Sequence, residues 1–281
     1  LENIQVAEMD DQATPAVPAS GKLKIYAKNL GGRMLFRQIG PSGLSTPLQP
    51  SFFQNFIVLI GPSSGSTLSS VGTGLTITGT TSHPNPSEAY GYMANLASAA
   101  TASATAGTGT SGTLCLRGAL GGGGFFFASR IAFPDASYNE SGATTGSRIF
   151  VGLTSLSMAA TVQSNLPAGS YAGFHRLHVN GSTQDDNWFF LTGNGVSNDR
   201  TDTGLPFLPG KIYDTYIFCA PSGNVISWRI DNLTDDLTAS GETTTHLPAA
   251  DTFLRAGIQL ATVNAVARNI RFQRIYIESD R

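Results

Sequence analysis

Apolar and polar residues alternate with a period of two along residues 22–39. Two such runs flank the stretch Asn29–Gly32, whose composition is that of a turn of about four residues. The pattern predicts a β-hairpin. Its expected apolar face is made by Leu23, Ile25, Ala27, Leu35 and Ile39. Because an isolated hairpin is marginally stable in water, we expect this one to pack against copies of itself or against another protein.

From residue 113 onward, short apolar runs alternate with turn sequences such as Asn-Gly, Ser-Gly and Pro-Ser-Gly. The chain has no amphipathic helical pattern and no βαβ spacing, so an all-β fold is predicted, with an antiparallel jelly-roll sandwich as its architecture. The Ala/Ser/Thr-rich stretch 90–112 also favours strand over helix, because no apolar stripe recurs at helical spacing. The expected strands are Thr113–Leu116, Gly124–Phe133, Arg148–Leu153, Gly173–Asn180, Asn187–Thr192, Ile212–Ala220, Val225–Asp231, Phe253–Leu260 and Ala267–Glu278.

The last of these runs is too apolar to stay exposed, so we expect it inside a sheet. Its alternation is imperfect around Ile275, Tyr276 and Ile277. Such a pattern indicates burial on both faces or a β-bulge.

Composition divides the chain into three parts. Residues 1–60 are interpreted as an N-terminal arm, residues 61–88 as a Gly/Ser/Thr/Pro-rich linker with one weak strand at Leu75–Ile77, and residues 89–281 as a jelly-roll head. The run Phe56–Ile60 adds to an apolar surface that the arm of one chain cannot bury by itself. We therefore expect a homotrimer held through residues 1–60.

Charge and cysteine content exclude several classes of function. Of the 281 residues 13% are charged, and the net charge is −2, which argues against binding through phosphate neutralisation and hence against a nucleic-acid partner. No run of about 18 apolar residues is present, so no membrane insertion is expected. Cys115 and Cys219 lie in apolar surroundings, which favours buried thiols over a disulfide. Without a Cys-x-x-Cys pair, no structural zinc is expected.

Catalytic patterns are missing from the sequence. A glycosidase needs two carboxylates facing one cleft, but the six glutamates are dispersed, and only Glu278 has an acidic residue two positions away. His175 and His178 are three residues apart, so on a strand they face opposite sides and cannot share a metal. We expect no enzyme activity, no catalytic residue, no metal and no cofactor.

The best-supplied binding segment is Thr183–Asp202. Planar amides and carboxylates beside an indole suit hydroxyl-rich ligands, since the polar groups bond hydroxyls and the ring covers an apolar sugar face. The candidate receptor-binding residues are Asp185, Asp186, Asn187, Trp188, Asn194, Asn198, Asp199 and Arg200. The alternative is that the Asp and Asn residues form turns and that Trp188 begins a buried strand.

Several segments together resemble bacteriophage tail-fibre and receptor-binding proteins, which are virion appendages with a concanavalin-like β-sandwich head. The segments are Pro18–Lys28 with Gly32 and Arg33, Gly122–Phe127 with Arg130, Phe150–Leu153, Phe218–Gly223 and Ile275–Arg281. The resemblance implies a homotrimer in the virion whose N-terminal arm docks on other virion proteins. It carries over no receptor residue.

Three functions follow as hypotheses. The first is a non-catalytic tail fibre or receptor-binding protein that attaches to a bacterial surface receptor such as a carbohydrate. The second is a purely structural virion component, such as a head fibre, decoration protein or baseplate protein. The third, a glycan depolymerase, is disfavoured because paired carboxylates are missing.

Overall fold

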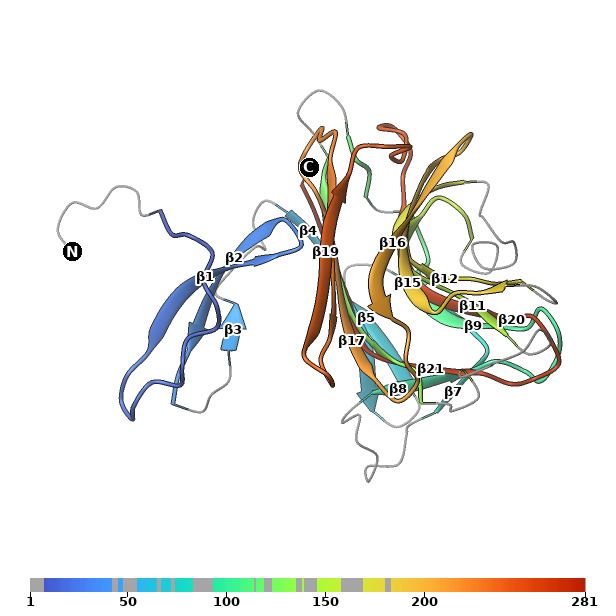
Figure 1. Cartoon of the computed structure of the whole chain (residues 1–281), viewed down its shortest axis with the longest axis horizontal. Coiled ribbons are helices and arrows are strands. Elements are labelled where there is room, and N and C mark those ends of the chain that lie inside the picture. The colour runs from blue at the N-terminus through green and yellow to red at the C-terminus, as the bar shows by residue number, and fades with distance from the viewer. Residues whose placement is uncertain are drawn as a thin grey trace.

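The computed structural model describes residues 8–41, 45–47, 55–64, 67–71, 74–82, 93–113, 115–118, 123–134, 138, 146–157, 169–179 and 183–280. Two large sheets packed face to face form the head, and a small sheet forms an arm beside it (Figure 1). Among these residues there is no α-helix, and hence no helix that could cross a membrane.

One layer of the head is a nine-stranded sheet. Its strands are β4 (Asn55–Ser64), β5 (Thr67–Val71), β7 (Thr80–Ser82), β8 (Ala94–Ala97), β10 (Phe125–Ala132), β17 (Ile212–Cys219), β18 (Ile226–Asn232), β19 (Leu237–Thr243) and β21 (Asn269–Asp280). The order is β19-β18-β17-β10-β21-β4-β5, with β8 pairing with β21 and β7 pairing with β8.

The other layer is a seven-stranded sheet. Its strands are β6 (Leu75–Thr78), β9 (Thr105–Thr110), β11 (Ser147–Thr154), β12 (Ser170–Arg176), β15 (Asn187–Asn194), β16 (Asn198–Pro206) and β20 (Arg255–Thr262). The order is β16-β15-β12-β11-β20-β9-β6, and every pairing in it is antiparallel. A short ladder of β13 (His178–Val179) and β14 (Thr183–Gln184) lies between β12 and β15 in the sequence.

The core lies between the two sheets, because alternate residues of each strand face inward. Aromatic rings fill one part of it: Phe133 contacts Tyr138, Trp188, Phe207 and Tyr213, with ring centroids 5.0–6.4 Å apart. Trp188 comes from the seven-stranded sheet and Tyr213 from the nine-stranded sheet, so these rings hold the two layers together.

Both cysteines lie in this core as free thiols, as predicted. Burial raises the pKa of Cys115 to about 12 and that of Cys219 to about 11, so both stay protonated at neutral pH.

The predicted behaviour of the last strand is confirmed. β21 lies in the middle of the nine-stranded sheet and pairs with β10 on one side and with β4 and β8 on the other. The register between β10 and β21 shifts between Arg130 and Ile131. The extra residue, Gln273, explains why Phe272 and Ile275, three positions apart, both face the core. Tyr276 packs against the cluster under the arm, so β21 is covered on both faces around Ile275–Ile277.

The boundaries predicted from composition differ from those in the structure. β4 pairs with β21, β5 pairs with β4, and β6 pairs with β9, so residues 55–82 contribute strands to the head rather than to an arm and a linker. Backbone pairing to central strands decides the structure of this Gly/Ser/Thr-rich stretch, which has a weak strand propensity of its own. Phe52, Phe53 and residues 83–88 of the expected linker lie outside the described residues.

The arm consists of β1 (Lys24–Leu30), β2 (Arg33–Ile39) and β3 (Ser45–Pro47) in sequential order. Leu30 pairs with Arg33, so the connecting loop has two residues, Gly31 and Gly32, both with positive φ (60° and 90°). Such a tight loop is typical of a two-residue hairpin turn, for which glycine is favoured.

This turn sets a register that differs from the predicted apolar face. Leu35 pairs with Lys28 and Ile39 with Lys24, which puts both on the face of Tyr26 and opposite Ile25. Leu35 and Ile39 are buried, whereas Ile25 is 49% exposed. In addition, Ile60 is fully buried in the core of the same chain. The apolar residues offered as the reason for a trimer are thus partly buried within one chain.

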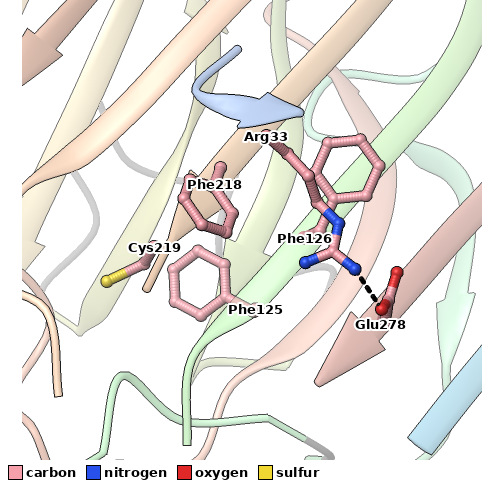
Figure 2. A pocket seen from close by; sticks show the side chains of 6 residues that line it. All are labelled: Arg33, Phe125, Phe126, Phe218, Cys219 and Glu278. Atoms are coloured by element: carbon pink, nitrogen blue, oxygen red, sulfur yellow. Dashed lines mark hydrogen bonds and ion pairs between the residues drawn. The ribbon is translucent and has the colours of Figure 1, made fainter. Parts of the chain in front are cut away.

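The buried face of the arm packs against the nine-stranded sheet, on the side away from the seven-stranded sheet (Figure 1). Leu30 and Leu35 contact a cluster that includes Phe126 and Tyr216 on the outer face of that sheet. Arg33 forms an ion pair with Glu278, as Figure 2 shows. Its guanidinium lies 5.7 Å from the centre of the Phe126 ring. The arm is therefore anchored to the head by both apolar and charged contacts.

Candidate functional site

The candidate residues lie along the β15–β16 hairpin, at one edge of the seven-stranded sheet. β16 is the edge strand, and its pairing with β15 places Asp202 opposite Phe189 and Arg200 opposite Leu191. Because Trp188 and Phe190 face the core, Phe189 and Leu191 lie on the outer face of the sheet. The structure thus brings part of the predicted segment to an outer sheet face.

Five residues gather there, and we refer to them as the edge cluster: Asp185, Asn187, Phe189, Arg200 and Asp202. The guanidinium of Arg200 lies 3.5 Å from the centre of the Phe189 ring and forms an ion pair with Asp185. The Asn187 amide donates to both carboxylate oxygens of Asp202, at 3.1 and 3.2 Å. A stacked guanidinium between an aromatic ring and a carboxylate is held rigidly, which prepares it to bind a ligand oxygen.

Asp185 is also held in place by the backbone of Leu177. Its carboxylate accepts a hydrogen bond from the backbone N–H of Leu177 at 2.6 Å, and its own N–H donates to the Leu177 carbonyl at 3.0 Å. Asp186 beside it is exposed, and its carbonyl accepts from the N–H of Phe207. These contacts tie the start of β15 to neighbouring segments, so the edge cluster has a stable base.

The hairpin tip lies at the other end of β15, away from the edge cluster. Asn194 accepts hydrogen bonds from the N–H groups of Val196 and Ser197 at 2.9 and 2.8 Å, so it acts as a turn residue. Asn198 is exposed, and Asp199 pairs opposite Thr192. Asn194, Asn198 and Asp199 therefore do not join the edge cluster.

Trp188 lies in the core with no exposed surface, and its ring centroid is 5.2 Å from that of Phe207 and 5.5 Å from that of Tyr213. Trp188 is thus part of a buried strand, which was the alternative to a role in ligand binding. The aromatic ring on the outer face at this position is that of Phe189. Because residues 188–191 are all apolar, the sequence does not show which of them face the core and which face outward.

Sequence reasoning missed His175 as a part of this face. It pairs with Phe189 across β12 and β15, and it is fully buried. Burial, together with the nearby Arg200 and Arg148 guanidinium groups, lowers the pKa of His175 to about 3, so the ring is neutral at physiological pH. Strand alternation could have indicated this position. Phe174 faces the core, so its neighbour His175 faces the outer side of the sheet.

Within the described residues no group of three or more His, Cys, Asp or Glu side chains could hold a metal ion. The side chain of His178, the other histidine of the predicted pair, lies outside the described part of the chain.

No protein-family model matches the chain, and no curated protein matches it by sequence. Solved structures do match it. A protein of unknown function from Shewanella oneidensis has a TM-score of 0.53 at 11% identity and covers 81% of this chain and 87% of its own. Arcelin-5, a lectin-like defence protein from Phaseolus vulgaris, has a TM-score of 0.52 at 10% identity, covering 81% and 100%.

A third match is the basic winged bean lectin with Tn-antigen, with a TM-score of 0.53 at 9% identity over 81% of this chain and 99% of that one. The head is a lectin-like β-sandwich. This confirms the predicted fold class, an all-β antiparallel sandwich of the concanavalin type. At these identities the likeness is one of fold.

Proposed function

We propose that this chain is a non-catalytic, saccharide-binding attachment protein: a phage tail fibre or receptor-binding protein that recognises a bacterial surface glycan. The edge cluster carries the proposal. It places a stacked guanidinium, an aromatic ring, carboxylates and an amide on one exposed edge of a lectin-like sandwich. Hydroxyl-rich ligands need this combination of planar hydrogen-bonding groups and an apolar ring face.

The virion setting and the homotrimer are parts of the same proposal, and the resemblance of the segments named above supports them. The arm offers a physical route. Its face opposite the head carries Leu23, Ile25, Met34 and Phe36, which are 40–56% exposed. In an attachment protein such a face contacts other copies of the chain or other virion proteins.

The test is binding of the purified full chain to intact host cells and to a glycan array. The double variant Asn187→Ala/Asp202→Ala removes the exposed polar half of the edge cluster and leaves the core unchanged. We expect at least tenfold weaker binding, while circular dichroism and the melting temperature stay the same. Ser240→Ala, on the nine-stranded sheet, is the matched surface control. Unchanged binding of the double variant, or wild-type protein that binds no glycan and no cell, would overturn the proposal.

A purely structural virion component is the second candidate, and the exposed apolar face of the arm favours it. The variant Phe36→Ser separates the two candidates. If attachment through the head is the function, isolated Phe36→Ser protein still binds glycans. If the protein is only structural, wild type and variant both fail to bind, and the variant changes the oligomeric mass measured by light scattering.

A further inference from the structure

The charges of the edge cluster do not balance. The guanidinium of Arg200 is paired with Asp185. The carboxylate of Asp202 accepts instead from uncharged donors: the Asn187 amide at 3.1 and 3.2 Å and the backbone N–H of Gly204 at 2.8 Å. Among the described residues no cation forms an ion pair with Asp202. The edge cluster therefore holds one carboxylate more than it can neutralise.

The rest of the β15–β16 hairpin adds negative charge. Residues 185–202 contain four aspartates, Asp185, Asp186, Asp199 and Asp202, but a single basic residue, Arg200. A local excess of one sign of charge attracts ligands of the opposite sign.

The groups further into the sheet do not offset this excess. The pKa of His175 is lowered to about 3, so its ring carries no charge at neutral pH. Arg148 lies on β11, and β12 and β15 separate it from the edge strand β16. Three strand spacings amount to roughly 14 Å, which exceeds the Debye length of about 8 Å at physiological salt. The positive charge of Arg148 is therefore largely screened at the edge strand.

Asp202 is both accessible and held in place. It is exposed on the edge strand, and the neighbouring side chains of Phe189 and Arg200 are only partly buried, so a ligand approaches from solvent without displacing protein. An ordinary surface ion pair contributes little, because two mobile side chains must be ordered to form it. The Asn187 amide and the Gly204 N–H already order the Asp202 carboxylate, which lowers this cost for a ligand.

The chemistry of a carboxylate limits the ligand. An ionised carboxylate only accepts hydrogen bonds, so its partner must donate. Hydrogen bonds between charged groups are roughly twice as strong as those between neutral groups, which favours an ammonium group over a hydroxyl. An acidic sugar is disfavoured, because its negative charge would lie beside that of Asp202.

We propose that the edge cluster selects a saccharide that carries an ammonium group, an amino sugar without an N-acetyl group. The ammonium group donates to Asp202, and hydroxyls of the same sugar pair with Asn187 and Arg200. The proposal rests on the proposed saccharide-binding function and specifies its ligand class.

The test compares linear trisaccharides of glucosamine and of N-acetylglucosamine with the same linkage, by isothermal titration calorimetry on the full chain. At pH 6 the amines of the first are protonated, whereas the second is neutral. At low salt, wild type should bind the glucosamine form at least fivefold more tightly. In 1 M salt the Debye length is about 3 Å, and the preference should fall below twofold.

Two variants assign the preference to Asp202. Asp202→Asn keeps the size of the side chain and an acceptor oxygen but removes the charge. It should bind both trisaccharides equally, and its binding of the N-acetylated form should change by less than twofold. Asp251→Asn makes the same change at an exposed residue in the turn before β20, four strands away from β16, and should keep the wild-type preference.

Equal binding of the two trisaccharides by wild type would overturn the proposal, and so would a preference that Asp202→Asn retains. If neutral glycans bind and require Asn187 and Asp202 while the glucosamine form binds no more tightly, the proposed function stands and only the ammonium selectivity is rejected. If no glycan binds, both are rejected.

Discussion

The outer faces of the two sheets both carry buried or half-buried polar side chains, but they differ in how these are paired. On the nine-stranded sheet, Arg130 makes a bidentate ion pair with Asp214 at 2.7 Å for each contact, and the Tyr216 hydroxyl donates to the same carboxylate at 3.2 Å. Asp231 accepts from Arg229 and from the Thr238 hydroxyl, each at 2.8 Å.

On the seven-stranded sheet, by contrast, the buried nitrogens of His175 and the amide nitrogen of Gln259 have no partner. Paired polar groups support a fold, whereas unpaired buried groups destabilise it unless a ligand or water satisfies them. The comparison teaches that the nine-stranded face is built for stability and for holding the arm. The seven-stranded face is where binding is expected.

The largest effect should come from breaking the pairing on the nine-stranded face. Asp214→Ala leaves the half-buried Arg130 without its carboxylate, and we expect a loss of about 3 kcal/mol in the free energy of unfolding. Urea denaturation measures it. Arg274→Ala is the control: this side chain is 43% exposed and lies 3.8 Å from Asp214, so its removal should change little. Equal losses for both variants would mean that the bidentate pair has no special role.

The next effect concerns pH and the seven-stranded face. The pKa of His175 is about 3 in the folded protein against about 6.5 when unfolded, so the unfolded state binds the additional proton below pH 6.5. Stability should therefore fall with pH between 6.5 and 3, by about 1.4 kcal/mol per pH unit from this group.

Urea denaturation at pH 7 and pH 4.5 of wild type and His175→Leu tests this. The variant should lose less stability on acidification than wild type, by roughly 2–3 kcal/mol. If both lose the same amount, His175 is not held neutral by burial, and the contrast between the two faces weakens.

A smaller, local effect is expected at the arm. Leu35→Ala removes an apolar contact with the Phe126 and Tyr216 cluster, which should weaken docking of the hairpin by about 2 kcal/mol. Hydrogen exchange should then speed up in β1 and β2 and stay unchanged in β11 and β12. Faster exchange throughout the head would show that arm and head unfold as one unit.

The smallest effect is expected at the hairpin tip. Asn198 is exposed and outside the edge cluster, so Asn198→Ala should change the free energy of unfolding by less than about 0.5 kcal/mol and leave glycan binding unchanged. A clear loss of glycan binding would extend the binding surface from the edge cluster to the tip.

The sequence was sufficient for the fold class and for most strands of the second half, because inward and outward residues alternate there. The imperfect alternation of apolar residues in β21 indicated burial on both faces or a bulge, and the strand has both. The strands β4 to β7 were not predictable in the same way, because Gly, Ser and Thr carry little alternation and pairing with β21 and β9 orders them.

The candidate face was predicted only in part. The edge cluster residues are near in sequence, so the segment that contains them could be found. His175 and Gln259 come together only through the registers of β20, β11 and β12, which are separated by long stretches of chain. Register between distant strands, and whether a buried donor finds a partner, cannot be read from local patterns.

The central claim is that the edge cluster on the seven-stranded sheet binds saccharide. Backbone amide NMR during titration with the glycan that binds most tightly on the array tests it most directly. The account predicts shifts that cluster at Asn187, Phe189, Arg200 and Asp202, with the signals of β17, β18 and β19 unchanged. Shifts confined to the nine-stranded sheet or to the arm, or no shifts at a saturating concentration of that glycan, would contradict it.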